Sequence, residues 1–256
     1  MKNEVKYFSF GEGKQTFVIL PGASIRPVIL NRAVIEGSYA AFASNYTIYL
    51  FDYLKSVHEG STIESISEDV ANKMKEIGIK DAYVLGCSMG GCIAQCLAIY
   101  HPELVSKILL GSTFSRPNEI TVKVIKEWED LAQKQDVVAL NKAIQRVNYS
   151  KEFYEKFKAA FQAMETEGSP EEIARFVHVA RALMNVNLYD QLDKIKCKVF
   201  VMGSFSDETV GGQASIEIAQ KIKCPLYLYA KYGHCVYDEA PDYKERIELF
   251  FEGKIT

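Results

Sequence analysis

The sequence predicts an open, mostly parallel α/β sheet flanked by helices, with a helical cap inserted between two of its strands. Two patterns support this fold class. Short apolar runs recur along the chain, and segments with helical periodicity separate them. The 256 residues suffice for one large domain, or for one domain that carries an insertion.

Six runs are expected to form the strands of this sheet, because they are almost continuously apolar instead of alternating. Such runs are typical of parallel strands that are buried on both faces. They lie at residues 16–20, 46–51, 82–86, 107–111, 198–203 and 226–230. Residues 4–20 are expected to form a hairpin that leads into the sheet.

Helices are expected between these runs, at about residues 27–43, 63–77, 89–100, 213–222 and 241–251. The second has the clearest pattern, since apolar side chains recur every three or four residues. Ser61, with Glu64 three residues later, predicts a capping box at its start.

The alternation of strands and helices stops between residues 115 and 190, where we find no convincing strand-like run. Amphipathic helices are expected there. One begins at Ser169, with Pro170 at the first helical position and Glu172 completing a capping box. The predicted division is a core domain of residues 1–114 and 191–256 and a helical cap of residues 115–190.

Composition and charge narrow the classes of partner. Hydrophobic residues make up 48% of the chain and charged residues 25%, as in ordinary globular proteins. The net charge of -3, without a long basic run, argues against nucleic acid and anionic membranes. The first residues lack the apolar core of a signal peptide, and no apolar run approaches the ~20 residues of a membrane span. A cytoplasmic location is therefore expected.

The cysteines are expected to be free thiols. Six occur, at positions 87, 92, 96, 197, 224 and 235, mostly within apolar strand or helix patterns. Without a secretion signal, buried thiols fit this pattern better than disulfides. Cys92 and Cys96 share one helix face, but no His or second Cys pair lies near them in the sequence. No metal site is therefore expected.

A serine at the tip of a predicted strand-to-helix turn is the strongest indication of chemistry. Gly-Cys-Ser-Met-Gly, residues 86–90, lies between an apolar strand and an apolar helix. Gly86 and Gly90 suit a turn that leaves no room for a Cβ atom. Ser88 would then project its hydroxyl, and the Met89 N–H would point toward a developing oxyanion. The alternative is a glycine-rich turn that only packs.

A serine nucleophile needs a base, and the chain has four histidines. His58 lies in a polar loop, and His178 lies mid-helix in the predicted cap. His101 ends the helix that follows Ser88, at the end far from the serine. His234 follows the last predicted strand, at the carboxyl edge where ligands gather in open α/β sheets. We therefore predict His234 as the base.

The acid that orients this base should follow another strand at the same edge. The loop after residues 198–203 supplies Asp207, with Glu208 as the second choice. The chain order is then Ser, Asp, His, as in the α/β-hydrolase architecture. The alternative is that both are solvated loop acids.

A second oxyanion donor is expected after the strand at residues 16–20, where Pro21, Gly22 and Ala23 follow. Gly22 permits close backbone approach, and the N–H of Ala23 is the candidate donor. An ordinary Pro-Gly turn is the alternative.

Four stretches together resemble the α/β-hydrolase-fold superfamily, over nearly the whole chain. "GCSMGG" resembles the family's nucleophile elbow and "HPELVSKILLGS" the segment that follows it. "LDKIKCKVFVMGSFSDETV" resembles the approach to the family's acid, and "YGHCVYDEAPDY" its histidine loop. The resemblance implies a capped serine hydrolase, esterase- or lactonase-like.

Two segments depart from the family pattern. Pro21-Gly22 stands where the family commonly has His-Gly, and "DYLKSVHEGS" from Asp52 replaces a usual glycine-rich turn. Some members have Cys as the nucleophile, but Cys87 lies one residue early, so we interpret it as a buried thiol.

The resemblance implies hydrolysis through an acyl-enzyme on Ser88, with His234 as base and Asp207 orienting it. The N–H groups of Ala23 and Met89 would hold the oxyanion, and neither a metal nor another cofactor is needed. The leading prediction is a carboxylesterase for a small or medium acyl substrate. Lactone, amide or carbon–carbon bond hydrolysis and perhydrolysis stay open.

Two alternative functions do not involve catalysis. The first is a small-ligand sensor of the same fold that signals through its cap to a protein partner. The second is an inactive scaffold, in which Asp207 or His234 would lie out of reach of Ser88. The substrate and the oligomeric state do not follow from the sequence.

Overall fold

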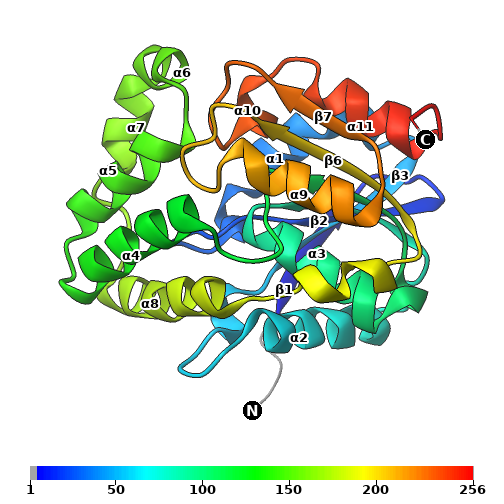
Figure 1. The fold of residues 1–256 in the computed structure, drawn as a ribbon, viewed down its shortest axis with the longest axis horizontal. Helices are drawn as coiled ribbons and strands as arrows, with labels where there is room; N and C mark the ends of the chain where they lie inside the picture. Colours follow the sequence, from blue (N-terminus) through cyan, green and yellow to red (C-terminus); the bar gives the residue numbers. More distant parts are fainter. Residues whose placement is uncertain (1–4, 256) are drawn as a thin grey trace.

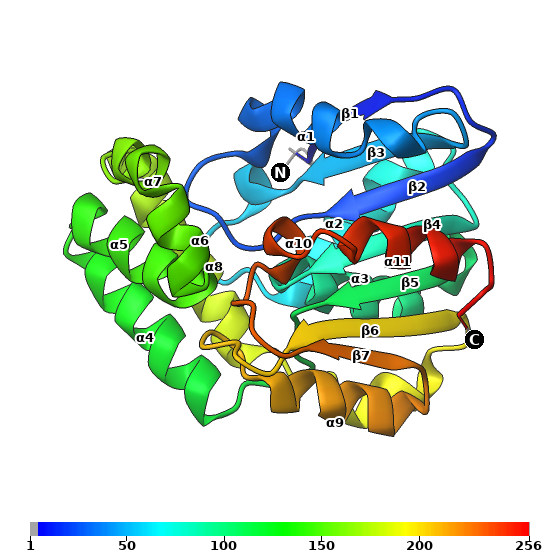
Figure 2. The same cartoon turned by 90° about the horizontal axis from the view of Figure 1, so that it is seen from above.

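The computed structural model describes residues 5–255. Its centre, within these residues, is a seven-stranded sheet of order β1-β3-β2-β4-β5-β6-β7. β1 runs antiparallel to β3, and the other neighbouring strands are parallel. Helices flank the sheet (Figures 1 and 2), so the predicted fold class is confirmed.

All six predicted runs form strands. The bounds of the seven strands are Lys6–Phe10 for β1, Gln15–Leu20 for β2, Tyr46–Asp52 for β3, Ala82–Cys87 for β4, Val105–Gly111 for β5, Lys198–Ser204 for β6 and Leu226–Tyr229 for β7. The last four residues of β2, β4, β5 and β6 are all buried, as expected for strands covered on both faces.

The predicted N-terminal hairpin is wrong. β3 lies between β1 and β2, and it pairs with β1 from Lys6 opposite Asp52 to Phe10 opposite Ile48. The connection from β1 to β2 crosses the start of β3, where a Cβ on Gly13 would lie 1.9 Å from the Asn45 carbonyl carbon. The turn residues between β1 and β2 predict only that the chain reverses there. They carry no information about β3, which lies about 30 residues further along the chain and inserts between the two strands.

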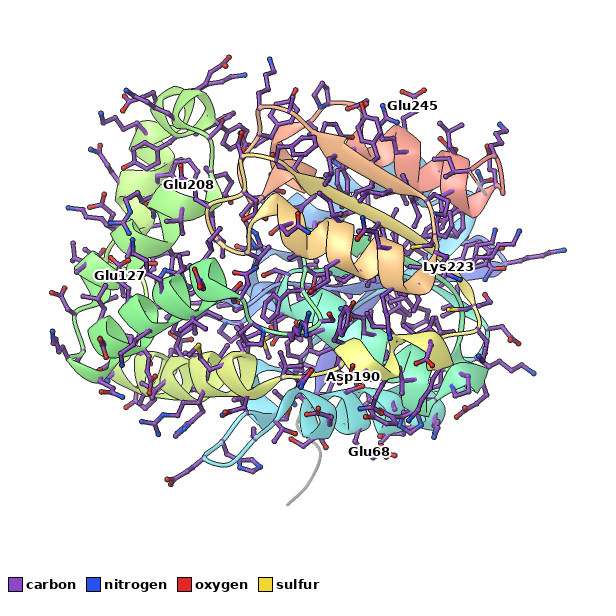
Figure 3. All side chains as sticks on the ribbon, in the orientation of Figure 1. Glu68, Glu127, Asp190, Glu208, Lys223 and Glu245 are labelled. Carbon is purple, nitrogen blue, oxygen red and sulfur yellow. The ribbon has the colours of Figure 1, made fainter. Side chains whose placement is uncertain are left out.

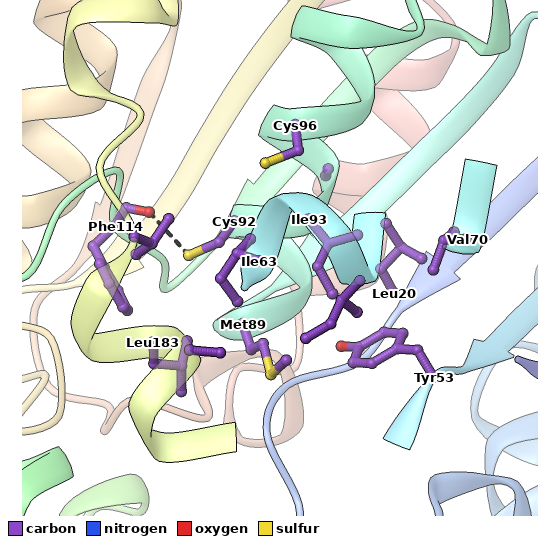
Figure 4. Packing of buried hydrophobic residues seen from close by; sticks show 14 of the residues in the cluster. Leu20, Tyr53, Ile63, Val70, Met89, Cys92, Ile93, Cys96, Phe114 and Leu183 are labelled. Atoms are coloured by element: carbon purple, nitrogen blue, oxygen red, sulfur yellow. Dashed lines mark hydrogen bonds between the residues drawn. The ribbon is translucent and has the colours of Figure 1, made fainter. Parts of the chain in front are cut away.

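Two buried clusters cover the two faces of the sheet. Consecutive β2 residues alternate between them, with Val18 and Leu20 in one cluster and Phe17 and Ile19 in the other. The first cluster lies under α2 (Ile63–Glu76), α3 (Met89–Tyr100) and α9 (Gly212–Ile222). The second lies under α10 (Val236–Glu239) and α11 (Tyr243–Phe251). Figure 4 shows part of the first cluster around Leu20, Met89 and Cys92.

The helix expected at residues 27–43 is broken into three pieces. The 3-10 turns Val28–Asn31 and Ala40–Phe42 flank α1, which spans only Arg32–Ser38. Tyr39 ends α1 by leaving the helical conformation, at φ -110° and ψ 14°.

Two capping predictions had different outcomes. The box at Ser169 is confirmed, with Ser169 Oγ accepting from the Glu172 N–H and Glu172 Oε2 accepting from the Ser169 N–H. The predicted box at Ser61 is wrong by one residue, because Thr62 caps α2 and exchanges bonds with Ser65. Ser61 instead accepts from the His58 N–H at 3.0 Å, which closes the preceding loop.

Five helices occupy the described residues between β5 and β6. They are α4 (Glu119–Gln133), α5 (Val137–Asn148), α6 (Lys151–Lys156), α7 (Lys158–Met164) and α8 (Pro170–Asn185). The parallel strands point toward them in Figure 2. α4 packs on α8 through Trp128 and Phe176, whose ring centroids lie 6.3 Å apart. The short helix Tyr189–Lys194 then leads to β6.

Within residues 5–255, none of the helices combines the length and the apolar character that crossing a bilayer requires.

Candidate active site

The predicted site residues lie in loops that leave the carboxyl ends of four parallel strands. Pro21 to Ala23 follow β2, Ser88 follows β4, Asp207 follows β6 and His234 follows β7. β2 and β4 are neighbours, and only β5 separates β4 from β6. Because parallel strands end at one edge, the four loops lie along the same edge of the sheet.

Ser88 occupies a strained turn between β4 and α3. Its φ of 52° and ψ of -122° belong to a region that side-chain-bearing residues rarely adopt. Hydrogen bonds hold it there. The Ser88 N–H donates to Gly111 O at 2.9 Å, and Ser88 O accepts from the Gly91 N–H at 2.8 Å and from Thr113 Oγ1 at 2.7 Å. Strand β5, helix α3 and the loop after β5 therefore fix the turn together.

The glycines around Ser88 are required by close contacts. A Cβ on Gly86 would lie 2.5 Å from Gly90 O, and one on Gly90 would lie 2.0 Å from Leu20 O. These contacts bring the end of β2 directly against the start of α3. Ser88 itself stays partly exposed between buried neighbours.

Asp207 and His234 form a buried pair. His234 Nδ1 lies 2.8 Å from Asp207 Oδ2, and each side chain is only 2% exposed. Asp207 Oδ1 accepts from the N–H groups of Thr209 at 2.8 Å and Val210 at 2.9 Å. Because a carboxylate can only accept, Nδ1 carries the proton in this bond. His234 Nε2 is then the basic nitrogen, as a general base requires.

The environment keeps Asp207 ionised. Burial by itself raises the pKa of this carboxyl, but the charge interaction and hydrogen bond with His234 oppose it, together with the Val210 and Thr209 N–H groups. The net pKa of Asp207 lies below its ordinary value. An ionised Asp207 is the form that can orient the imidazole and stabilise its protonated state.

The second-choice acid and the other histidines lie elsewhere. Glu208, the residue after Asp207, is exposed. His58 is exposed, His101 bonds Glu68 Oε2 at 2.7 Å at the far end of α3, and His178 lies within α8. In the described part of the chain, His234 is thus the histidine that is buried against a carboxylate.

The loop after β2 runs past Ser88. A Cβ on Gly22 would lie 3.2 Å from Ser88 Cβ and 3.8 Å from Ser88 Oγ. Among residues 5–255, no hydrogen-bond acceptor faces the N–H groups of Ala23 or Met89. Ser88 Oγ likewise makes no hydrogen bond within this range. Two free N–H donors near a serine are the arrangement that an oxyanion hole needs, and their roles stay predictions.

Tyr53 was not singled out from the sequence, yet it positions the Pro21 loop. Its side chain is 1% exposed and its hydroxyl donates to Pro21 O. Tyr53 belongs to the segment after Asp52 that departs from the family pattern. The unusual Pro-Gly turn and this unusual loop are therefore in direct contact, which the sequence spacing could not reveal.

The segment from the last residues of α5 to the start of α6 also escaped prediction, and it joins the loops that carry Asp207 and His234. Asn148 O accepts from the Cys235 N–H at 2.7 Å, and Asn148 Oδ1 accepts from Thr209 Oγ1 at 2.8 Å. The Glu239 carboxylate accepts from the N–H groups of Ser150 at 3.0 Å and Gly233 at 2.9 Å. We call residues 147–150 the bridging segment.

The cysteines are free thiols, as predicted. Burial raises the pKa of the Cys87 thiol well above its ordinary value, so Cys87 stays protonated beside Ser88. Burial also raises the pKa of Cys92 to about 12, and its Sγ lies 3.2 Å from Phe114 O (Figure 4). Neither buried thiol is an activated nucleophile.

A strained serine turn and a buried Asp–His pair, both at the carboxyl edge of a parallel sheet, define a class of hydrolases. The chain belongs to the alpha/beta hydrolase fold family, whose model matches residues 39–241. It is therefore a hydrolase of the α/β fold.

Individual proteins resemble this chain at low sequence identity or over only part of its length. "Putative carbamate hydrolase RutD" of Caulobacter sp. (strain K31) is 22% identical over 216 residues, which are 78% of this chain and 80% of that protein. A pimeloyl-[acyl-carrier protein] methyl ester esterase of Hamiltonella defensa subsp. Acyrthosiphon pisum (strain 5AT) is 36% identical over 117 residues, 43% of this chain and 40% of that protein.

Among solved structures, the enol-lactonase from Burkholderia xenovorans LB400 superposes with a TM-score of 0.83. The superposition covers 97% of this chain and 96% of that chain, at 17% sequence identity. At this identity the likeness shows a shared fold and no shared substrate.

Proposed function

We propose that the protein hydrolyses a small or medium carboxylic ester through an acyl-enzyme on Ser88. The buried 2.8 Å bond between His234 and Asp207, at the sheet edge that also carries the strained Ser88 turn, is the observation that carries this proposal. Two similar proteins are named for ester and lactone cleavage, which are both acyl transfers to water. A carbamate ester would react by the same steps.

In the first half of the reaction, Ser88 Oγ attacks the substrate carbonyl carbon while His234 Nε2 takes the hydroxyl proton. Asp207 holds the Nδ1–H and stabilises the imidazolium. The N–H groups of Ala23 and Met89 bind the oxyanion, and losing one such donor typically costs about 2.7–4 kcal/mol in the barrier. His234 then returns the proton to the departing alcohol.

In the second half, water attacks the acyl carbon and gives its proton to His234 Nε2. Collapse of the second oxyanion releases the carboxylic acid and regenerates the Ser88 hydroxyl, with the proton returned by His234. These steps need only groups that the chain itself provides.

We also propose that residues 115–190 act as the cap of a core formed by residues 1–114 and 191–256. The five helices lie beyond the carboxyl ends of the strands, where they would roof the space above Ser88 (Figure 2). Trp128, Phe161 and Phe176 are buried in helix packing. Substrate size would thus depend mainly on the other side chains of the cap.

The test is the mass of the intact protein after exposure to a fluorophosphonate, for native protein and Ser88→Ala. We expect one adduct on the native protein, mapped to Ser88, and none on the variant. Hydrolysis of a panel of esters of increasing acyl length should fall by about 10⁴-fold or more in Ser88→Ala. Well-folded native protein that takes up no adduct would contradict the proposal and favour a ligand-sensing role.

A further inference from the structure

A cavity lies beside the loops that carry Asp207 and His234. It has a volume of about 870 Å³ and lies between α4, α5, the start of α6 and the loops that follow β6 and β7. Ser88, Asp207 and His234 are not among its lining residues.

The cavity is positively charged, although the chain as a whole has a net charge of -3. Four cationic side chains line it, against two carboxylates, Glu127 and Glu208, which Figure 3 labels. The four are Lys142, Arg146, Lys151 and Lys231. A cationic hollow of this kind raises the local concentration of anions.

Two of these cations form no ion pair with a carboxylate of the described residues. Arg146 already pairs with Glu127 at 2.8 Å, and Lys142 pairs with Glu165 at 3.2 Å. Lys151 and Lys231 have no carboxylate partner within residues 5–255, and Lys231 Nζ lies 5.6 Å from the centroid of the neighbouring Tyr232 ring. Their ammonium groups therefore have donor capacity left for an anion.

The remaining walls are aromatic and apolar. Tyr149, Tyr154 and Tyr232 line the cavity together with Leu131 and Val147. Tyr154 stacks on Phe161 with ring centroids 5.2 Å apart and an angle of 11° between the planes. Apolar walls with a few convergent polar groups are typical of small-molecule sites.

We propose that this cavity binds a small organic carboxylate, with its charge near Lys151 and Lys231 and its apolar body against the tyrosines. Binding would also restrict the motion of the loops that carry Asp207 and His234. Ser206 and Glu208 of the lining flank Asp207, and Gly233 directly precedes His234. The cavity would thus be an effector site for the hydrolase.

The bridging segment provides the physical link between the two sites. Val147, Tyr149 and Ser150 line the cavity, while Asn148 between them holds Thr209 and Cys235. A Cβ on Gly233 would lie 2.7 Å from Asn148 O, so the segment and the His234 loop cannot move independently. Binding itself does not depend on the role proposed for Ser88, whereas the effect on catalysis rests on the proposed function.

Calorimetry with 4-phenylbutanoate, and with the neutral alcohol 4-phenylbutan-1-ol as its isostere, tests the site. The carboxylate should bind native protein about tenfold more tightly than the alcohol, and more weakly as salt is added. The double variant Lys151→Glu/Lys231→Glu should lose about tenfold in affinity. The matched variant Lys134→Glu/Lys156→Glu changes the same charge outside the cavity and should bind like native protein.

Equal affinity for the carboxylate and the alcohol, or equal affinity of the two double variants, would overturn the site. Ester hydrolysis with and without saturating carboxylate then tests the coupling. We expect a change in kcat, because the probe binds away from Ser88. A rise in KM alone would show competition at Ser88 and overturn the effector role, whereas a protein without esterase activity would leave the binding result valid.

Discussion

The helix that follows Ser88 and the outer helices of the insertion are held in opposite ways. In α3, ten of the twelve residues are buried. In α6 no residue is buried, and in α7 only Phe161 is. Packing on all sides thus fixes the serine turn, whereas the outer insertion depends on a few specific contacts.

Those contacts are an aromatic cluster and the bridging segment. Tyr149 and Phe153 stack at 5.3 Å, and Phe153 lies 4.6 Å from Phe157. The bridging segment beside them bonds the acid and base loops. The core therefore positions Ser88, the proposed nucleophile, whereas contacts from both the core and the insertion hold the Asp207–His234 pair.

Among the variants that distinguish these two regions, the largest effect is expected from Asp207→Asn, which leaves the core packing intact and disturbs the Asp207–His234 pair. An amide can donate to Nδ1 and favour the wrong tautomer, so kcat for ester hydrolysis should fall by about 10³–10⁴-fold. Steady-state kinetics measure it. Asp193→Asn, an exposed change of the same kind, is the control. A loss below tenfold would remove Asp207 from the mechanism.

Gly90→Ala tests the packing of the core around the Ser88 turn. The added methyl would lie 2.0 Å from Leu20 O, so α3 and the end of β2 must separate, at a cost of about 3 kcal/mol in the free energy of unfolding. Urea unfolding measures the loss. Gly37→Ala in α1 meets no atom within 4 Å and should be neutral or slightly stabilising. Similar results for the two variants would mean that the elbow is not tightly packed.

Asn148→Ala tests the contribution of the insertion to the acid–base pair. Losing the bond from Thr209 to Asn148 Oδ1 should cost about 1 kcal/mol in stability. We expect kcat to fall several-fold with little change in KM, and the pH profile of kcat to shift. Asn185→Ala, which removes a bond on the exposed side of α8, should lower stability alone. A pH profile identical to that of native protein would limit Asn148 to a structural role.

The smallest effect is expected in the thermal stability at acid pH. Because the pKa of Asp207 is lowered on folding, its ionised form stabilises the folded state above the unfolded-state pKa of about 3.9. This contribution is lost as the pH falls through the lower folded-state pKa. The difference in Tm between native protein and Asp207→Asn should therefore be full at neutral pH and shrink below pH ~4. A difference that grows on acidification would contradict the lowered pKa.

Patterns between near neighbours in the chain were predicted well. The continuous apolar runs gave all six strands, because burial on both faces leaves no polar alternation. The Ser169 box was correct, while the box expected at Ser61 formed at Thr62, one residue on. Which residue caps a helix depends on the other hydrogen bonds that each hydroxyl can form, and the Ser61 hydroxyl accepts from the His58 N–H instead.

Partners that are distant in the chain were not predictable. Tyr53 holds Pro21, and Asn148 holds Thr209 and Cys235, across 32 to 87 residues. Nothing in the sequence around Asn148 marks it, since an Asn at the end of a helix is common in any fold. The choice between Asp207 and Glu208 likewise depended on which side of the loop faces His234.

The sequence by itself determined the strands, the glycine-framed turn at Ser88 and the order of serine, acid and histidine, because these depend on residue type and on spacing along the chain. Only the tertiary structure decided that β3 separates β1 from β2 and that the bridging segment joins the acid and base loops. Those outcomes depend on the mutual packing of segments far apart in the chain, where shape and hydrogen-bond geometry select among many partners of similar local pattern.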